Sequence, residues 1–494
     1  MKTIYSILAM ILITAGYLNA QNEDDALRYS QNFYGGTARS VSMGGAFGSL
    51  GGDFSSISYN PAGLGVYRSS EFTFTPSLYY AQADATYLNS NYNDFKYNFN
   101  FNNMGLVGAY NSGNDDGWVS TNFAFGYNRM NNFHNMITIQ GVNNESSITD
   151  YFANQADGIQ PDNLFSGYNA FEAGLAWDSY LIDPDIATTD SNDYISVLDP
   201  EYGETQRQVI ETKGSIGEYI LSMGANYKHK LYIGGSIGIQ SVRYNKSMTH
   251  TEIDENDSIN GFSEMTYKNH LDTRGTGFNF KFGMIYRPAE WSRIGIAIHT
   301  PTFFDMKDEY GAEMDSYFDN GDSYHADPLS NDGEILKGVY DYRLTTPFKA
   351  MGSLSFMIKK KGLISVDYEF IDYRTARLRA GDYDFYQENG YIQSIFRATA
   401  NIKAGLEYKI NDIFAVRGGY AMYGSPYTSS EVNKDNVTKS ISAGFGLRDE
   451  GFFFDMAFVY TMASKYHYLY SLNNASALID NNSSSVLATF GFRF

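Results

Sequence analysis

A serine motif and seven histidines are the residues of this chain whose types suit covalent or acid–base chemistry. Residues 234–238 read Gly-Gly-Ser-Ile-Gly and have the G-x-S-x-G spacing of a nucleophilic serine. Such a serine works at a sharp turn between a strand and a helix, but the alternation here predicts a continuous strand with no helix after it. The histidines are scattered from residue 134 to residue 467, and no two have the spacing of metal or haem ligands. We therefore expect no enzymatic activity, no cofactor and no bound metal.

A second chemistry is the binding of a carboxylate by a buried cation. Lys281, Lys403 and Arg417 all fall on the predicted inward face of alternating strands, where a dry pocket would orient a charged head group. They are our candidate ligand-binding residues. Acidic side chains share this inward face: Asp367, Glu369 and Glu407. Mixed charges on adjacent strands more often brace a wall, and a bracing ladder is the alternative interpretation.

The elements that must position these residues are strands with a period of two. In residues 278–286, every second residue is apolar and the residues between them are Asn279, Lys281 and Gly283. Fourteen such segments follow residue 70: 71–85, 95–111, 117–141, 204–227, 230–254, 263–287, 291–306, 335–359, 362–375, 395–409, 412–424, 438–448, 451–464 and 484–494. Short and long connections alternate between them, as in bacterial membrane barrels, which have an even number of strands. The pattern predicts an all-β fold, a transmembrane antiparallel β-barrel of about 14 strands, with charged residues facing the lumen.

Both ends of the chain indicate a protein of the cell envelope. Lys2 and the apolar run from Ile4 to Ala15 predict a signal peptide over residues 1–20. No later stretch approaches the 18 apolar residues of a membrane-spanning helix. At the other end, Phe490, Phe492 and Phe494 share one face of the last strand, which resembles the terminal strand that the insertion machinery of Gram-negative bacteria recognises. We expect a bacterial outer-membrane location, with lipid and lipopolysaccharide around the barrel.

Charge and cysteine content narrow the remaining classes of protein. The formal net charge of −20 argues against nucleic acid as a partner. The chain contains no cysteine, so disulfides and thiolate metal sites are excluded.

The largest predicted external loops are 142–203 and 307–334. The first carries twelve acidic residues and no Lys, Arg or His, and we expect a short amphipathic helix over residues 169–181. A solvated acidic cap is the simplest interpretation of this loop, and a divalent-ion site beside lipopolysaccharide phosphates is the alternative.

The segment before the first strand has a different composition. Nine of the residues 35–65 are glycine, and the segment ends in Asn60-Pro61-Ala62-Gly63, a sequence that favours a turn. Its A-R-S-x-x-M-G-G-A-F run and the Asn-Pro-Ala-Gly-Leu sequence resemble the N-terminal region of the FadL/TodX family, outer-membrane transporters of long-chain fatty acids and other hydrophobic compounds. The resemblance extends over most of the chain.

The resemblance implies a domain organisation and a mechanism. Residues 21–69 would form a hatch inside the lumen, and residues 70–494 the barrel. Hydrophobic cargo would pass from a groove among the external loops to a lumen pocket, and movement of the hatch would open a route onward. Asn60, Pro61, Ala62 and Gly63 would hold or release the hatch. The alternative function is a structural or adhesive barrel with a closed lumen, whose external loops bind a partner.

Overall fold

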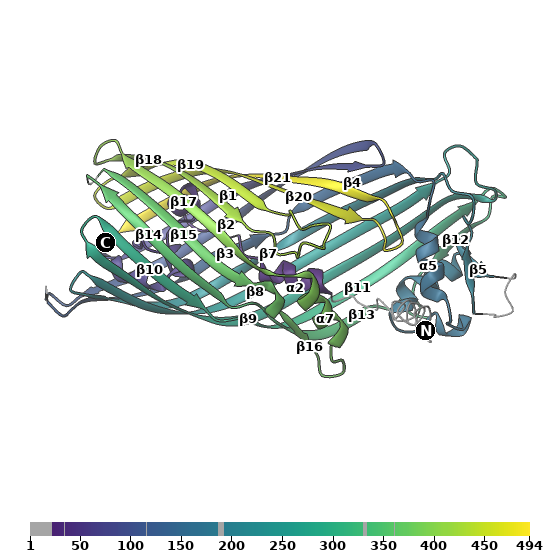
Figure 1. Ribbon diagram of the computed structural model, residues 1–494, viewed down its shortest axis with the longest axis horizontal. Coiled ribbons are helices and arrows are strands. Elements are labelled where there is room, and N and C mark those ends of the chain that lie inside the picture. Colours follow the sequence, from purple (N-terminus) through teal and green to yellow (C-terminus); the bar gives the residue numbers. More distant parts are fainter. Residues whose placement is uncertain (1–21, 34, 115, 186–191, 330–332, 360) are drawn as a thin grey trace, which may run out of the picture.

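The protein forms a closed antiparallel barrel (Figure 1). The computed structural model describes residues 22–494 except 34, 115, 186–191, 330–332 and 360, so the predicted signal peptide lies outside the described residues. Fourteen strand tracks make up the wall, and β21 closes it by pairing with β1. The tracks are β1 (Glu71–Tyr87), β2 (Ser90–Asn111), β3 (Trp118–Asn132) continued by β4 (Asn135–Val142), β7 (Thr205–Tyr227), β8 (Leu231–Ile253), β9 (Phe262–Ala289), β10 (Ser292–His299) continued by β11 (Phe303–Phe318), β13 (Gly338–Thr345) continued by β14 (Lys349–Ile358), β15 (Gly362–Asp372) continued by β16 (Arg377–Arg379), β17 (Ala398–Lys409), β18 (Phe414–Tyr423), β19 (Thr438–Arg448), β20 (Phe452–Tyr468) and β21 (Ser476–Arg493). The predicted fourteen-stranded barrel is confirmed.

Alternation along the strands produces the two faces of the wall. On β9 the exposed large apolar residues are Phe278, Phe280, Phe282, Met284 and Tyr286. The residues between them include Asn279 and Lys281, both 2% exposed. Charged side chains on the lipid face near mid-bilayer cost about 2–4 kcal/mol for Lys or Arg, so the alternation is set by the membrane itself. We call the ring of exposed apolar residues around the barrel the apolar belt.

The strands differ greatly in length. β9 has 28 residues and β7 and β8 have 23 each, whereas β14 and β18 have 10 each. Because roughly 9–11 tilted residues cross a bilayer, the long strands project beyond the membrane at the end opposite the C-terminus (Figure 1). The wall is therefore tall on one side of the external mouth and low on the side of β14 to β19.

Two segments outside the predicted strands, the predicted external loop 307–334 and the connection 465–483, are mainly strand. Residues 307–334 contain the outer half of β11 and the hairpin strand β12 (Ser323–Ala326), and residues 465–483 contain the ends of β20 and β21. Both segments lie beyond the bilayer, where water contacts the outer face of the wall and polar residues can face outward. The alternation of apolar and polar residues that identifies a lipid-facing strand is therefore absent, although the strands remain paired by backbone hydrogen bonds.

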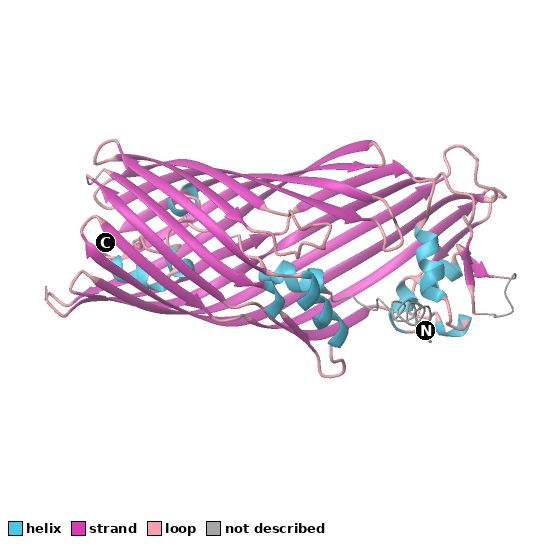
Figure 2. Ribbon diagram, in the orientation of Figure 1, coloured by secondary structure: helices cyan, strands magenta, loops and turns pink. Residues whose placement is uncertain are grey.

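The hatch fills the lower lumen. It consists of α2 (Glu23–Ser30), α3 (Ala38–Ser42), α4 (Ser56–Tyr59) and the 3-10 helix η1 (Pro61–Val66). Figure 2 shows helices inside the barrel near the C-terminal end. Phe47, Phe54 and Leu64 are fully buried against the wall. Glycines permit the close approach: a Cβ atom on Gly65 would lie 2.6 Å from the carbonyl oxygen of Ala225 on β7.

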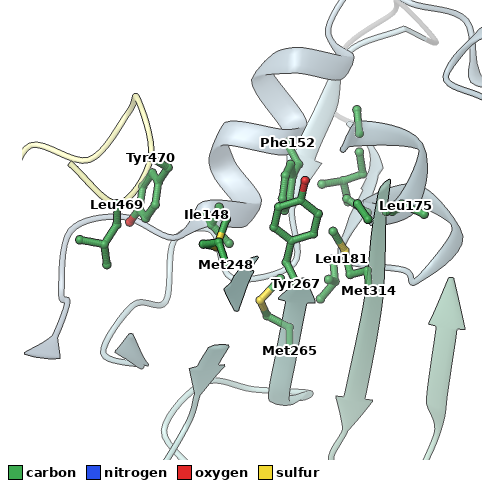
Figure 3. Packing of buried hydrophobic residues seen from close by; sticks show 14 of the residues in the cluster. Ile148, Phe152, Leu175, Leu181, Met248, Met265, Tyr267, Met314, Leu469 and Tyr470 are labelled. Carbon is green, nitrogen blue, oxygen red and sulfur yellow. The ribbon is translucent and has the colours of Figure 1, made fainter. Parts of the chain in front are cut away.

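A second helical layer, which we call the cap, covers the tall end of the barrel. It spans residues 143–204 and contains α5 (Ile148–Ala156), η2 (Pro161–Asn163), η3 (Gly167–Phe171), α6 (Ala173–Asp178) and the small sheet of β5 (Ile182–Pro184) and β6 (Tyr194–Ser196). Figure 3 shows Phe152 and Leu181 of the cap against Tyr267 and Met314 of the wall. The helix expected over residues 169–181 corresponds to η3 and α6. Further helices are η4 (Tyr373–Thr375) and α7 (Tyr386–Ile395), beside α2. None of the described helices has the length and apolar character required to cross a bilayer.

Candidate functional site

A cavity of about 540 Å³ lies in the lumen between the hatch and the cap. Val41 and Gly44 of the hatch line one end, and Ile137, Ile210 and Ile479, which also belong to the cap's apolar cluster, line the other. The walls between these ends carry hydroxyl and amide side chains: Ser77, Asn100, Thr438, Ser440, Ser442, Thr461, Asn481 and Ser483. The cavity is therefore amphipathic, because apolar side chains line it together with polar and charged ones.

The wall beside this cavity has an opening in its hydrogen-bond ladder. β2 pairs with β3 only over Asn103–Asn111, and within the described chain residues 90–102 of β2 pair only with β1. The facing strand β4 pairs only with β7. We call this unpaired stretch between residues 90–102 and residues 129–142 the seam. Asn100, Asn102 and Arg129 line the cavity, so the cavity reaches the seam.

Side chains cross the seam where the backbone does not. Lys96 Nζ lies 2.5 Å from Glu211 Oε1 of β7, and the amide of Asn98 lies 3.1 Å from His134 Nε2. The Arg129 guanidinium donates to the carbonyl oxygen of Phe101 at 3.4 Å. These contacts connect long side chains whose rotamers can change without breaking a ladder.

The hatch occupies the inner side of the seam. The backbone N–H of Phe33 donates to the Met130 carbonyl oxygen at 2.8 Å, and that of Gly35 donates to the Arg129 carbonyl oxygen at 2.9 Å. These two carbonyl groups lie on β3 where its pairing with β2 has ended. The hatch thus extends the sheet on its inner side at the seam.

Positive charge is concentrated in the cavity. Lys246 of β8, Lys465 of β20 and Arg28 of α2 all line it. Arg28 forms an ion pair with Asp25 and lies over the Tyr244 ring, 4.4 Å from its centroid. Lys246 and Lys465 form no ion pair with any described residue. The carboxylate of Asp24 also lines the cavity, but neither lysine is in direct contact with it. Two ammonium groups beside apolar surface form a site suited to an anionic head group.

Sequence reasoning missed Lys246 and Lys465. The alternation of β8 places Lys246 on the inward face with Tyr244 and Met248, and this signal was present in the sequence. Lys465 lay just beyond the predicted end of its strand at residue 464. The two lysines come from strands far apart in the chain, so no pattern of neighbouring residues could show that they line the same cavity.

The three cations predicted from sequence lie at the boundary between wall and hatch. Lys281 is paired with Glu218 of β7. Lys403 lies over the Tyr59 ring of α4, 4.9 Å from its centroid. Arg417 donates to Glu407 Oε2 at 2.6 Å and to Asp455 Oδ1 at 2.7 Å. None of the three is among the cavity-lining residues of the described chain. Their role in binding a head group stays a prediction.

Acidic residues of the same ladder hold the hatch. The Arg39 guanidinium of α3 contacts Glu407 Oε2 at 3.0 Å, and the Gly48 N–H donates to Asp367 Oδ2 at 2.8 Å. His299 Nε2 lies 2.8 Å from the carbonyl oxygen of Tyr59. The buried charges of β10 to β18 therefore form polar contacts to the hatch and to each other.

The Asn60–Gly63 sequence is a buried anchor. Asn60 Nδ2 donates to the Gly48 carbonyl oxygen at 2.6 Å and lies 3.3 Å from the carbonyl oxygens of Met284 and Ile296 on the wall. Its Oδ1 accepts from the Ala62 N–H at 3.1 Å, and Pro61 begins η1. Gly63 packs so closely that a Cβ atom there would lie 3.0 Å from Gly51 Cα. The turn joins two parts of the hatch to β9 and β10.

No group of three or more His, Asp or Glu side chains within the described ranges is arranged to hold a metal ion.

Comparison with solved structures places this architecture among known barrels. A FadL homologue of Pseudomonas aeruginosa superposes with a TM-score of 0.55 and 13% identity, covering 94% of this chain and 100% of that chain. The P. putida toluene transporter TodX superposes with a TM-score of 0.53 and 12% identity, covering 93% and 99%. The chain has the FadL/TodX fold. No protein-family model matches it, and neither does any curated protein sequence. The FadL/TodX fold and the apolar belt identify an outer-membrane barrel.

Proposed function

We propose that this protein mediates passive uptake of hydrophobic small molecules, such as long-chain fatty acids, across the outer membrane. The observation that carries the proposal is the cavity of about 540 Å³ that lies between cap and hatch and reaches the seam. Small-molecule sites typically enclose about 300–1,000 Å³ and are largely preformed. The TodX structure with the same fold is that of a toluene transporter, which supports a hydrophobic cargo.

The low side of the wall suits the arrival of cargo from outside. β20 pairs with β19 only as far as Met462, and beyond it Tyr466 is bonded instead to the Asn433 side chain of an external loop. Lys465 lies on this stretch and lines the cavity. Cargo gathered among the external loops would enter beside β20 and would meet the lysines first.

The seam is the proposed way out of the cavity. Cargo would pass between β2 and β3 into the bilayer once Phe33 and Gly35 leave the β3 edge and the side-chain contacts across the seam separate. Few backbone hydrogen bonds must break for this step, because the β2 edge is already unpaired over residues 90–102. The Asn60–Gly63 anchor would keep the rest of the hatch in place during the movement, so that the lumen stays closed.

The cations of the cavity suit a cargo with a carboxylate. Lys246 and Lys465 would bind the head group through charge-assisted hydrogen bonds, which are about twice as strong as neutral ones. The acyl chain would lie toward Ile137, Ile210 and Ile479.

The test is to lock the seam in cells. Because the chain has no cysteine, the variant Asn98→Cys/His134→Cys carries the only thiols, and a short reducible bis-maleimide would join β2 to the β3–β4 track. We expect cross-linking to stop uptake of a fluorescent long-chain fatty acid and reduction of the linker to restore it.

The matched control joins two strands that are already paired. Ser247→Cys/His270→Cys places a thiol pair on β8 and β9, where the two residues are direct partners outside the seam. Uptake should be unchanged by this link. Normal uptake through the locked seam would reject the lateral route, and absence of any cargo in mass spectra of the purified barrel after incubation with fatty acids would reject the transport proposal itself.

The alternative of an adhesive barrel predicts a solid lumen. Buried charges and the hatch do fill the lower lumen, but the cavity above them favours the transporter.

A further inference from the structure

Three basic side chains form a row across the outer surface of the barrel. Arg243 of β8 and Lys307 of β11 are both direct partners of Arg274 of β9, and all three are exposed. Directly opposed residues on one face have Cβ atoms about 4.5–5.5 Å apart, and like charges in such pairs are destabilising. A bound anion would relieve this repulsion.

The row has a fixed place relative to the apolar belt. On β8 the outward-facing residues run from Ile239 of the belt through Ser241 to Arg243. On β9 the same order is given by Phe278, Thr276 and Arg274. Four residues of strand correspond to roughly 13 Å. On β8 and β9 the sequence of apolar, hydroxyl and basic side chains matches the order of acyl chain, polar linkage and phosphate in a membrane lipid. On β11 the residue between Phe303 and Lys307 on this face is Asp305, which forms an ion pair with Arg343.

The existing ion pairs of the row are weak. Arg274 contacts Asp272 at 2.9 Å and Lys307 contacts Glu309 at 2.9 Å, with the side chains of Arg274 and Lys307 71% and 47% exposed. Both acids lie farther from the belt than their cations, and exposed pairs of this kind contribute little. Arg243 forms no ion pair with any residue in the described part of the chain.

The row has no counterpart on the described parts of β1, β2 and β20. On β1, β2 and β20 the outward-facing residues beyond the belt are Gln82, Asp84, Asn93 and Ser464, and none of these is basic.

Exposed carboxylates border the row at Lys307, whose direct partner on β13 is Asp341. The direct partners of Arg243 are Ser215 and Arg274, so the positive charge of the row is strongest at the two arginines.

We propose that Arg243, Arg274 and Lys307 bind a phosphate group of a phosphorylated glycolipid of the outer leaflet, the lipid A class, whose acyl chains lie along Ile239 and Phe278. The planar guanidinium groups match phosphate oxygens in a bidentate manner, and the hydroxyls of Ser241 and Thr276 lie between phosphate and belt. The site faces away from the lumen, so it is independent of the proposed transport route.

The experiment measures lipid retention by native mass spectrometry. The detergent-purified barrel is incubated with bis-phosphorylated lipid A, and wild type is compared with Arg243→Gln/Arg274→Gln. We expect about tenfold weaker retention in the double variant, as expected for the loss of charge-assisted contacts. Lys268→Gln is the matched control, because Lys268 lies farther out on β9 and is paired with Glu313. Its retention should equal that of wild type, and heat-modifiable migration on gels verifies that each barrel is folded.

Three results would overturn the proposal. Retention by the double variant equal to that of wild type would show that the two arginines do not bind the lipid. Equal binding of dephosphorylated lipid A by wild type would show that the phosphate is not the group recognised. Equal displacement by phosphatidylglycerol would assign the site to ordinary anionic phospholipid instead of the glycolipid.

Discussion

The hatch is held at residue scale by polar contacts that leave few alternatives. Asn60, Arg39 and Gly48 each reach from the hatch to a different buried acceptor, on the wall or on the hatch itself. A buried polar group without its partner costs about 1–3 kcal/mol, so each contact is costly to break singly. The glycines on either side allow backbone contact that no larger residue would permit.

Replacing Asn60 with Ala should loosen the hatch while leaving the barrel folded. The Gly48 carbonyl oxygen would lose its partner, and we expect hatch docking to weaken by about 1–3 kcal/mol. Hydrogen exchange of residues 35–65 should rise accordingly. Asn111→Ala is the control, because its amide also binds a backbone carbonyl, that of Arg68, but in an exposed position. Unchanged exchange in the Asn60 variant would contradict an anchoring role.

Replacing Lys246 and Lys465 with Gln should weaken the binding of charged cargo but not that of neutral cargo. The carboxylate of a fatty acid would lose its counter-charge, and we expect binding to weaken by about tenfold. Binding of the corresponding methyl ester should not change. Fluorescence titration of the purified barrel measures both ligands, and equal losses for acid and ester would indicate damage to the cavity instead of a lost head-group contact.

At the scale of elements, the cap depends on buried carboxylates. The N-terminus of α5 is held by Glu252 of β8, whose Oε1 accepts from the Ile148 N–H at 2.9 Å. Farther into the cap, Glu172 accepts hydrogen bonds from the hydroxyls of Tyr151 and Tyr168 at 2.8 Å and 3.2 Å. Burial raises the pKa of the Glu172 carboxyl to about 7.

The stability of the cap should fall as pH rises toward 7. The pKa of Glu172 is about 7 in the folded cap and near its usual 4.5 in an unfolded one, so the folded cap binds the extra proton between these values. The stabilising effect is therefore complete below pH 4.5, decreases up to pH 7 and is then constant, with a total of at most about 3 kcal/mol.

Hydrogen exchange of residues 148–178, corrected for the intrinsic pH effect, measures this change. Glu172→Gln should reduce the pH dependence between 4.5 and 7 by the share that Glu172 contributes, whereas Asp162→Asn, which alters an exposed cap carboxylate, should preserve it. A pH dependence in the Gln variant equal to that of wild type would contradict the role of Glu172, because Glu204 and Asp150 of the cap, whose pKa values burial also raises, would then account for all of it.

At the scale of the whole molecule, the barrel is closed by two independent fillings. The hatch fills the lower lumen through polar contacts, glycine contacts and apolar clusters with the wall, and the cap fills the tall end through a separate apolar cluster. The wall itself closes through the pairing of β1 with β21, and this pairing involves neither filling. The cavity exists because the two fillings do not meet.

Deleting residues 22–67 should convert the barrel into a conducting pore. The wall would keep its fourteen tracks, but the inward charges of β7 to β20 would contact water in place of the hatch. We expect a large rise in ion conductance of planar bilayers, with heat-modifiable migration preserved. Conductance equal to that of wild type in a folded variant would show that the cap alone seals the lumen.

The amino-acid sequence by itself determined the membrane-spanning wall. Successive residues of each strand face the lipid and the lumen in turn. The number of strands and the inward position of Lys281 could therefore be read from neighbouring residues in the sequence. The absence of alternation before residue 70 also marked the hatch. The inward positions of Asp367 and Glu407 were predicted correctly.

Only the tertiary structure decided the rest. The outer parts of β11 and β20 have no lipid contact and hence no alternation of apolar and polar residues, so the sequence predicts loops there. The seam is an absence of pairing between β2 and the β3–β4 track, which depends on the register of whole strands. Lys246 and Lys465 approach each other from β8 and β20 only because the barrel closes, and the cavity between them depends on how far hatch and cap each extend into the lumen.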